Sequence, residues 1–451
     1  MSKWTSIGSE IAQFMEEKGR TLLVKGLPGT GKTTLALTIM QHVRGKPKIY
    51  VSTKLPEEMV RSLLPWSERL FLGENRFEDA TLITPELFAS QIFEAARNGA
   101  SIIVLDSWDT FAKRMDSPLR MRTEGSIVTA ARSFGTRVVF VSEEPTQTTL
   151  DYTVDGVVEL RTTTLDGRRL REMELVKLRG TRIASPYMLY TLSGANFTAF
   201  SEFTQPEYRR METTPSATID DGRVIFGSRA LDAFFGFGSL RRGDTVGVEY
   251  ASNVPRTAFM ASYLPLITSF LRSKRGVLML PLPTFKPQDL LQVLRTHLDA
   301  QTVEEYFRVV CFGEPATRDA PLINISSLDL QGAFSLIEKE LETLKAKSCD
   351  GVVMTLWSTS PLRALYASKL VEVTELLSRM ISRLSFEGDL PLIAFDEDSP
   401  LRPTMISLCR RHIKLAFIHG TLLAYGVVPY TGVYAFEPSD NPFEPKLTEI
   451  V

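Results

Sequence analysis

A glycine-rich segment near the start of the chain has the residue types and spacing that hold phosphate groups. Residues 26–34 read Gly-Leu-Pro-Gly-Thr-Gly-Lys-Thr-Thr, which fits the pattern G-x-x-x-x-G-K-[ST]. Its glycines let backbone N–H groups turn toward phosphate oxygens, Lys32 supplies a charge for the β- and γ-phosphates, and the Thr33 hydroxyl can bind Mg²⁺. We therefore predict a site for ATP with Mg²⁺. The predicted contact residues are Gly26, Pro28, Gly29, Thr30, Gly31, Lys32, Thr33 and Thr34.

The segments on both sides of this motif suit phosphate binding. An apolar run typical of a strand (21–25) precedes it, and a run typical of a helix (35–40) follows. A glycine turn before a helix can arise by chance, but the strand–loop–helix context favours a phosphate site at the helix N-terminus.

Strand and helix signals alternate through the next hundred residues, which predicts a parallel sheet. Strands are expected at 47–52, 101–106 and 137–142, with helices starting at Pro56 and covering 85–97 and 124–134. Ligands of open α/β sheets gather at the C-terminal ends of the strands. Asp106, at such an end, is the predicted second Mg²⁺ ligand, although an acid there can also simply cap a loop.

A residue that activates the attacking water is harder to identify. Such a side chain must orient or deprotonate the water. The acids near the predicted sheet edge are Glu143, Glu144, Asp109, Glu57 and Glu58. We keep Glu143 as the candidate base.

The pattern changes after residue 150 to shorter strand-like runs around an Asp166-Gly167 turn, which indicates an antiparallel extension of the sheet. This stretch is basic. The cluster comprises Arg161, Arg168, Arg169, Arg171, Lys177, Arg179 and Arg182. It could be a solvated edge, an arginine finger toward a neighbouring subunit, or a nucleic-acid contact over residues 161–182.

Composition limits the class of protein. A chain of 451 residues favours two domains, and a net charge of −1 gives no global attraction to nucleic acid or membrane. The three cysteines and four histidines have no metal-ligand spacing. With no apolar run long enough to cross a bilayer and no signal peptide, we expect a cytoplasmic protein without a membrane partner.

The motif, the Asp106 strand and the segment Lys177-Leu178-Arg179-Gly180-Thr181 together resemble the RecA-superfamily ATPases of the KaiC/RadA type. In such proteins a K-x-R-G-[ST] segment presents its lysine and arginine to the ATP of the adjacent subunit. The resemblance thus implies that Lys177 and Arg179 act in trans and that the chain forms a homo-oligomer.

One departure from this resemblance concerns the catalytic base. KaiC-like domains carry a Glu-Glu pair after their second strand, whereas Thr53 and Lys54 stand at those positions here. Tyr50 to Lys54, Pro65-Trp66 and the arginine-rich stretch before Lys177 are closer to the archaeal GvpD subgroup, named for a gas-vesicle regulator that represses through an activator protein. The resemblance implies slow hydrolysis and a regulatory protein partner.

The second half is similar to the first but lacks its chemistry. Residues 350–357 align with 101–108, so that Thr355 falls opposite Asp106. Residues 393–398 resemble 140–144, a strand end with the acids that follow it. Residues 418–421 align with 178–181, so that His419 falls opposite Arg179 and Phe417 opposite Lys177. At the P-loop position stands Tyr-Ala-Ser-Asn-Val-Pro-Arg-Thr (250–257), without glycines and with a proline that lacks an N–H. An unrelated α/β domain that matches by chance is the alternative.

These observations predict an α/β protein of two tandem RecA-like domains, each a mainly parallel sheet flanked by helices with an antiparallel extension. The expected ranges are 1–200 for the ATP-binding domain, 201–221 for a linker and 222–451 for a pseudo-ATPase domain. The expected function is a regulatory or assembly ATPase with weak turnover at one site per chain. The alternatives are a recombinase-paralogue-like ATPase that handles DNA and a nucleotide-binding scaffold or transcriptional regulator without hydrolysis.

Overall fold

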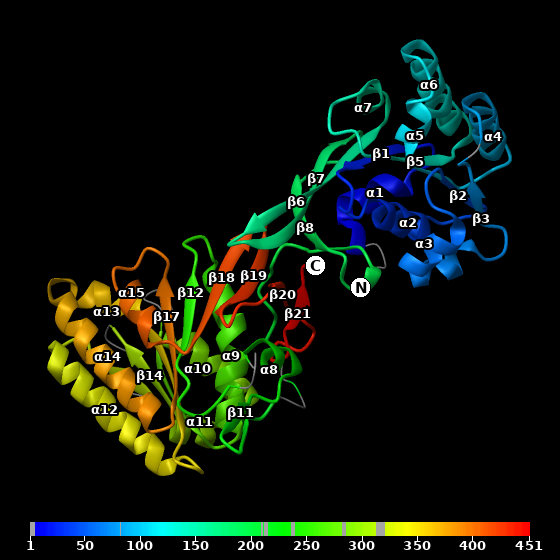
Figure 1. Cartoon of the computed structure of the whole chain (residues 1–451). Coiled ribbons are helices and arrows are strands. Elements are labelled where there is room, and N and C mark those ends of the chain that lie inside the picture. The colour runs from blue at the N-terminus through cyan, green and yellow to red at the C-terminus, as the bar shows by residue number, and fades with distance from the viewer. Residues whose placement is uncertain are drawn as a thin grey trace. The chain divides into compact units, whose positions relative to one another are not determined.

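Two α/β units make up the computed structural model, which describes residues 5–81, 83–208, 211, 215–235, 240–281, 286–312 and 321–451. The first unit contains residues 1–202, 419–421 and 449–451, and the second contains 203–418 and 422–448 (Figure 1). Within the predicted linker, Thr213 and Thr214 lie outside the described residues, whereas Thr218–Asp220 form a short strand, β10, that pairs with β11.

The sheet of the first unit has the strand order β3-β2-β4-β5-β1-β6-β7-β8-β9. Its strands from β3 to β6 are parallel, and β6 to β9 are antiparallel. The strands are β1 (Thr21–Gly26), β2 (Lys48–Ser52), β3 (Arg76–Asp79), β4 (Ile102–Asp106), β5 (Arg137–Ser142), β6 (Gly156–Leu165), β7 (Arg168–Leu178), β8 (Tyr187–Thr191) and β9 (Thr198–Ala199).

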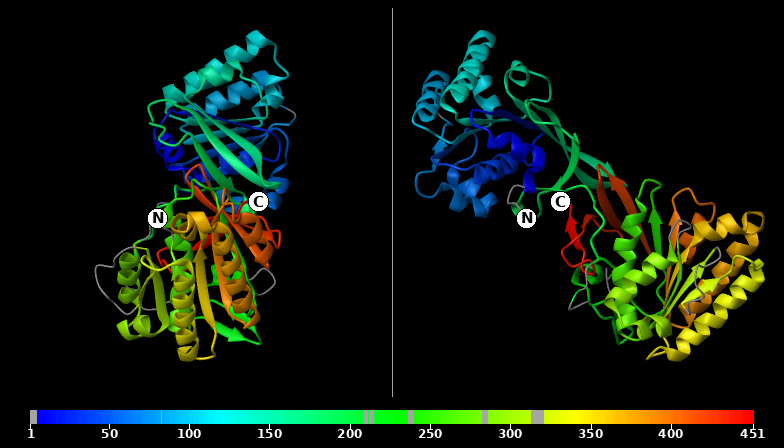
Figure 2. Two further views of the ribbon diagram at one scale, coloured as in Figure 1. Left: turned by 90° about the vertical axis from the view of Figure 1, so that its left-hand side faces the viewer. Right: turned by 180° about the vertical axis from the view of Figure 1, so that it is seen from behind.

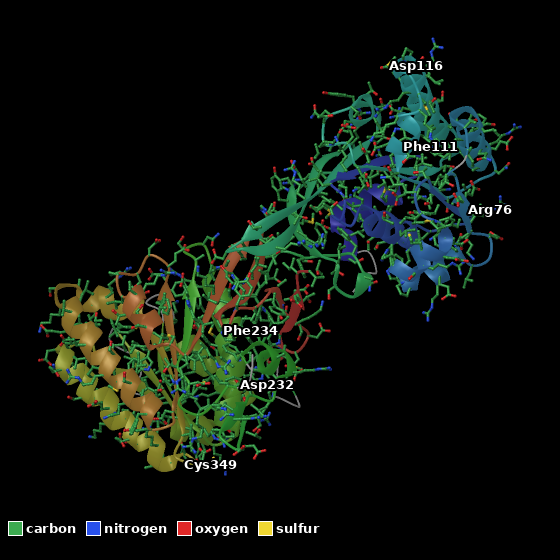
Figure 3. The ribbon with its side chains drawn as sticks, in the orientation of Figure 1. Arg76, Phe111, Asp116, Asp232, Phe234 and Cys349 are labelled. Carbon is green, nitrogen blue, oxygen red and sulfur yellow. The ribbon has the colours of Figure 1, made fainter. Side chains whose placement is uncertain are left out.

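Helices cover both faces of this sheet, because its central strands are apolar on both sides. Leu22 and Val24 pack against α1 and α2 on one face, while Leu23 packs with residues of α4 to α7 on the other. Figure 3 marks Phe111 of α5, which is buried, and the exposed Arg76 and Asp116. The helices are η1 (Thr5–Ile7), α1 (Ser9–Glu16), α2 (Lys32–His42), α3 (Glu57–Leu63), η2 (Pro65–Phe71), α4 (Pro85–Arg97), α5 (Trp108–Ala112), α6 (Ser117–Phe134), α7 (Thr149–Thr153) and η3 (Ser193–Ala195).

The second unit repeats this arrangement, with the strand order β15-β14-β13-β16-β17-β12-β18-β19-β20-β21. From β15 to β18 the strands are parallel, and β19 and β20 are antiparallel. The strands of this unit are β10 (Thr218–Asp220), β11 (Arg223–Ile225), β12 (Val246–Tyr250), β13 (Gly276–Leu280), β14 (Phe307–Cys311), β15 (Leu322–Asn324), β16 (Val353–Ser358), β17 (Leu390–Asp396), β18 (Arg411–Ile418), β19 (Thr421–Val428), β20 (Val433–Glu437) and β21 (Lys446–Glu449).

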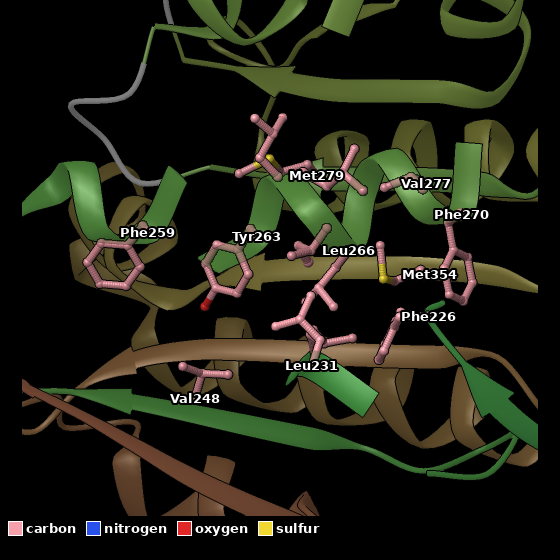
Figure 4. Packing of buried hydrophobic residues seen from close by; sticks show 14 of the residues in the cluster. Phe226, Leu231, Val248, Phe259, Tyr263, Leu266, Phe270, Val277, Met279 and Met354 are labelled. Atoms are coloured by element: carbon pink, nitrogen blue, oxygen red, sulfur yellow. The ribbon is translucent and has the colours of Figure 1, made fainter. Parts of the chain in front are cut away.

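The core of the second unit lies between α9 and the sheet. Phe259, Tyr263, Leu266 and Phe270 recur at helical spacing on α9 and pack over Val248 and its neighbours (Figure 4). Figure 2 shows helices on both faces of this sheet as well. The helices are α8 (Arg229–Phe235), α9 (Arg256–Arg272), α10 (Pro287–His297), α11 (Ala300–Tyr306), α12 (Leu330–Lys347), α13 (Thr359–Leu365), η4 (Ala367–Lys369), α14 (Leu370–Phe386) and α15 (Arg402–Leu408).

The predicted fold class is confirmed: both units are mainly parallel sheets flanked by helices, with antiparallel extensions, as in tandem RecA-like domains. Strand β12 corresponds to β1, since α9 begins at Arg256, six positions after Tyr250, as α2 begins six positions after Gly26. Across the described residues, no helix is long and apolar enough to cross a membrane.

One part of the predicted alignment between the halves is wrong. In the first unit Asp106 pairs with Val141, which pairs with Val24; in the second, Ser358 pairs with Ala394, which pairs with Val248. Ser358, not Thr355, therefore occupies the Asp106 position. The two tryptophans misled the alignment, because Trp108 begins a helix whereas Trp357 lies within β16.

The predicted match of His419 to Arg179 is also wrong. His419 and Gly420 form the turn between β18 and β19, with φ of 48° and 77°. Asp166 and Gly167 form the turn between β6 and β7 with φ of 47° and 75°. Two consecutive residues with positive φ make the tight turn that suits the twist of a hairpin. His419 thus corresponds to Asp166, and Phe417 does not stand at the Lys177 position.

Candidate functional site

The glycine-rich segment forms a loop between β1 and α2 whose backbone depends on its glycines. Gly26, Gly29 and Gly31 have φ of 152°, 80° and 91°, which L-residues with a Cβ rarely adopt. A Cβ on Gly26 would lie 2.5 Å from the Leu160 carbonyl oxygen, and one on Gly31 would lie 2.7 Å from the Leu192 side chain. The loop takes the shape in which successive N–H groups can surround an anion.

Two side chains from the antiparallel extension hold the carbonyl groups of this loop. Arg171 on β7 donates to the Gly29 carbonyl at 3.0 Å, and the Tyr190 hydroxyl on β8 donates to the Thr30 carbonyl at 2.5 Å. Neither role was predicted, because strands far along the chain supply both side chains. Burial raises the pKa of Tyr190 to about 12, so the hydroxyl keeps the proton that it donates.

Lys32 is the first residue of α2, and its side chain is buried. Its ammonium donates to the Leu27 carbonyl at 2.9 Å. Burial lowers the pKa of Lys32, and the charges of Glu143 and Asp106 oppose that shift. The N–H groups of the first turn of a helix lack partners inside the helix, so Lys32 and these donors offer an anion both charge and hydrogen bonds.

Thr33 and Asp106, the two predicted Mg²⁺ ligands, are in direct contact. The Thr33 hydroxyl donates to the Asp106 carboxylate at 2.6 Å, and the Tyr50 hydroxyl donates to the same oxygen at 2.8 Å. Burial raises the pKa of Asp106, while these two hydroxyl groups counteract the rise. An oxygen-only pair at this point fits Mg²⁺, which takes one or two protein oxygens and completes its shell with phosphate and water.

Tyr50 was not predicted to belong to the site. It lies in β2 and is fully buried, and burial beside Asp106 raises its pKa well above the usual value. A tyrosine between the apolar residues Ile49 and Val51 was the signal that could have indicated it, since a buried phenol requires a hydrogen-bond partner.

Glu143, the candidate base, lies directly after β5 and forms an ion pair with Lys54. The Lys54 ammonium and the Glu143 carboxylate are 2.6 Å apart. Burial works to raise the pKa of Glu143, but the hydrogen bond and charge of Lys54, with the charge of Lys32, outweigh it and leave the pKa lowered. The carboxylate is therefore ionised, as a base requires, but held by a cation.

Lys177 and Arg179 do not join these residues. Lys177 pairs with Val157 near the start of β6, and β6 starts beside Leu22 of β1, roughly 13 Å along the strand from Gly26. The Lys177 ammonium donates to the Asp151 carbonyl at 2.6 Å, and the Arg179 guanidinium donates to the Tyr152 carbonyl at 3.1 Å. Both side chains thus contact α7 rather than the phosphate loop of their own chain.

The basic cluster does not form one continuous surface. Arg168 and Arg171 are buried, and Arg161 is paired with Glu159 and Glu174. Arg169, Arg179 and Arg182 are exposed. Alternation along β7 divides the cluster between the two faces of the extension, so its charge is spread more thinly than the sequence suggested.

The corresponding loop of the second unit has a different backbone and different contacts. All of residues 250–257 are described, and none has a positive φ. The Ser252 N–H donates to the Glu397 carboxylate at 3.1 Å, so a carboxylate of the chain itself occupies a donor of the loop. Arg256, at the Lys32 position, is exposed, whereas Lys32 is buried.

The strand order, the phosphate loop and the paired Thr33 and Asp106 define a P-loop nucleotide-binding domain of RecA-like fold in the first unit. Comparison with known families agrees. The model of the family "GvpD gas vesicle protein, P-loop domain" matches residues 11–83 and 87–176.

Two curated proteins of Halobacterium salinarum are similar to the chain. Protein GvpD2 is 32% identical over 296 residues, which is 59% of this chain and 59% of that protein. Protein GvpD1 is 30% identical over 329 residues, which is 66% of this chain and 61% of that protein. The chain spans about three fifths of the length of these relatives. The family model thus matches most of the first unit, and the matched residues include Tyr50 to Lys54 and Pro65-Trp66, which resemble the GvpD subgroup.

Proposed function

We propose that the protein is a nucleotide-dependent regulatory protein that binds Mg²⁺ and ATP at one site per chain and hydrolyses the nucleotide slowly. The observation that supports it best is the difference between the two corresponding loops. The first has three glycines with positive φ, while the second has none and its Ser252 N–H contacts Glu397. A single site would let the chain exist in two ligand states, and a ligand that favours one conformation shifts the population toward it.

In this proposal each residue of the site has a defined task. The loop and Lys32 bind the phosphates, and Thr33 and Asp106 hold Mg²⁺, which neutralises charge on the phosphate oxygens when it is bound. Glu143 takes the proton of the attacking water as the bond between the γ-phosphorus and the bridging oxygen breaks, which yields ADP and phosphate. The exposure of Glu143 and its pairing with Lys54 support slow rather than fast turnover.

We further propose that the active form is a homo-oligomer. Lys177 and Arg179 contact α7 rather than the phosphate loop of their own chain, which is compatible with a role at the nucleotide of a neighbouring subunit. Mixing Lys32→Ala chains with Arg179→Ala chains tests this proposal. Activity restored by mixing supports action in trans; two inactive variants that stay inactive together, or an active Arg179→Ala protein, contradict it.

Titration with a fluorescent ATP analogue tests the number of sites. We expect one analogue per chain in the presence of Mg²⁺ and weaker binding after chelation of the metal. Two analogues per chain would contradict the single-site proposal, and none would contradict nucleotide binding altogether. Steady-state turnover with and without single-stranded DNA, at two salt concentrations, addresses the DNA-handling alternative, because phosphate contacts weaken steeply as salt rises.

A further inference from the structure

The ion pair between Lys54 and Glu143 spans the end of the strand that carries Asp106. In the sheet order, β4 lies between β2 and β5. Lys54 follows β2 and Glu143 follows β5, so their side chains meet across the C-terminal end of β4, 2.6 Å apart. The next strand beyond β5 is β1, which leads into the phosphate loop. The pair therefore spans the end of the strand that carries the predicted metal ligand, and Glu143 follows the strand next to β1.

The backbone on both sides of this ion pair is fixed. The Thr53 N–H donates to the Asp106 carbonyl at 2.8 Å, and the Thr53 hydroxyl donates to the Ser107 carbonyl at 3.0 Å. On the other side, the Glu143 N–H and the Ser142 hydroxyl both donate to the Asp109 carboxylate. The two side-chain ends can thus change partners while their main chains stay in place.

The ion pair itself is only weakly favoured. The side chains of Lys54 and Glu143 are 44% and 35% exposed, and ion pairs this exposed to solvent contribute little to stability. A γ-phosphate carries more charge than a carboxylate and offers three oxygens. It would compete well for the Lys54 ammonium if bound next to it.

The register of the sheet places Glu143 close to the phosphate loop. Ser142 of β5 pairs with Lys25 of β1, so Glu143 follows at the level of Gly26, the first residue of that loop, one strand away. Lys32 is the residue that contacts the β- and γ-phosphates in a P-loop. A γ-phosphate next to Lys32 would therefore lie within the electrostatic reach of the Lys54–Glu143 pair.

We propose that Lys54 senses the γ-phosphate: its ammonium moves from the Glu143 carboxylate to the bound γ-phosphate and thereby releases Glu143 to act as the base. This inference rests on the proposed binding of ATP. It assigns a positioning role to the lysine that stands where KaiC-like relatives have glutamate. The released Glu143 accepts one proton from water while the water oxygen bonds to the γ-phosphorus and the bond to the ADP oxygen breaks.

The test compares a triphosphate with a diphosphate. Binding of a non-hydrolysable β,γ-imido ATP analogue and of ADP is measured by fluorescence competition, with Mg²⁺, on the full chain. We expect Lys54→Gln to lower the affinity for the analogue by about tenfold and the affinity for ADP by less than about twofold, because only the analogue has a γ-phosphate. We expect Glu143→Gln to bind the analogue a few times more tightly, since Lys54 no longer has a competing partner.

A second exposed ion pair, formed within α3, provides the control. Arg61 and Glu57 form a pair on α3 with both side chains 37% exposed, so Arg61→Gln should leave both affinities unchanged. Equal weakening of ADP and the analogue by Lys54→Gln, or no weakening of either, would overturn the inference. Thermal unfolding of Lys54→Gln identifies a variant that fails to fold, and Lys54→Arg, which keeps the charge, should then retain the preference for the triphosphate.

The outcomes separate this inference from the proposed function. If the unmodified chain binds neither nucleotide, the proposed function fails and Lys54 has no ligand to sense. If it binds both, and Lys54→Gln still prefers the triphosphate as strongly as before, the site binds nucleotide but Lys54 does not sense the γ-phosphate.

Discussion

The loop at residues 26–33 and its counterpart at 250–257 each connect the central strand of a sheet to the helix that follows it. Only the first has a backbone suited to binding an anion. Both follow the central strand of a parallel sheet, and both lead into a helix six positions later. The first has three positive φ values, and the second has none. The fold thus survives without the glycines, whereas the anion-binding backbone does not, because tyrosine and proline cannot adopt those dihedral angles.

The strand before each loop shows a second difference. Lys25 in β1 and Glu249 in β12 are both buried and occupy the same position in their strands. Lys25 pairs with Asp151 at 2.9 Å, whereas Glu249 contacts His412 at 2.9 Å and Arg402 at 3.1 Å. The charged side chain at this position thus differs in sign between the two units, and in each unit ion pairs within that unit neutralise it.

The largest expected effect comes from the lysine of the first loop. Lys32→Ala should lower ATP affinity by about 100-fold or more, because it removes a buried ammonium from the phosphate site. Arg256→Ala, the same change in the second unit, should leave affinity unchanged. Fluorescence titration of both variants measures the difference. An equal loss of ATP affinity in the two variants would show that the second loop also binds phosphate. If Lys32→Ala left the affinity unchanged, the assignment of residues 26–34 as a P-loop would be wrong.

Glu249 should make the folding stability of the second unit depend on pH. Burial alone would raise the pKa of Glu249, but His412, Arg402 and Lys414 outweigh it and lower the pKa to about 2. Because the folded pKa lies below the unfolded one, the stabilisation is present above pH 4.5 and is lost as pH falls toward 2. The loss amounts to about 3 kcal/mol.

Calorimetry can assign this loss to the second unit. Nucleotide should raise the unfolding temperature of the first unit only, so the unfolding transition that it does not shift belongs to the second unit. The midpoint temperature of that transition should fall between pH 5 and pH 2, and Glu249→Gln should make the fall smaller. Burial and the Lys25 hydrogen bond act oppositely on Asp151, whose pKa is lowered, so the first unit weakens in acid as well. An unchanged pH profile in Glu249→Gln would contradict the assigned cause.

Most of the fold, and the residues of the phosphate site, could be predicted from local sequence. The helix 85–97 and the strand 137–142 were predicted with the observed bounds, since apolar runs and proline mark them clearly. The partners Tyr50, Arg171 and Tyr190 could not be predicted, because strand pairing brings them to the site from distant positions. The alignment errors at Thr355 and His419 have the same origin: spacing along a strand is set by register, which a single sequence does not display.

A smaller effect is expected at the metal ligand. Asp106→Asn should weaken binding of ATP with Mg²⁺ by about 10- to 100-fold and have little effect on binding without the metal. Stability of the protein without nucleotide should not fall, because burial already disfavours the charged form of Asp106. Ser358→Ala, at the corresponding position, should change neither property. Titrations with Mg²⁺ and with a chelator distinguish this result from a general loss of folding.

The smallest expected effect comes from alanine substitutions at two glycines of the first loop. They distinguish backbone strain from a steric clash of the added Cβ. Gly29 has φ of 80° and open space around its Cβ position, so Gly29→Ala should cost only the strain of that backbone, about 1–2 kcal/mol. Gly31→Ala adds a contact of 2.7 Å with Leu192, so it should weaken nucleotide binding more. Leu192→Ala, combined with each glycine variant, should restore part of the binding lost in Gly31→Ala and none of that lost in Gly29→Ala.

The reverse changes in the second loop, Asn253→Gly and Pro255→Gly, should not create a nucleotide site, since the Glu397 carboxylate still accepts a hydrogen bond from the Ser252 N–H. Binding titrations of these variants would contradict this account if Gly29→Ala proved the more damaging change, or if the second loop gained affinity from its glycines alone.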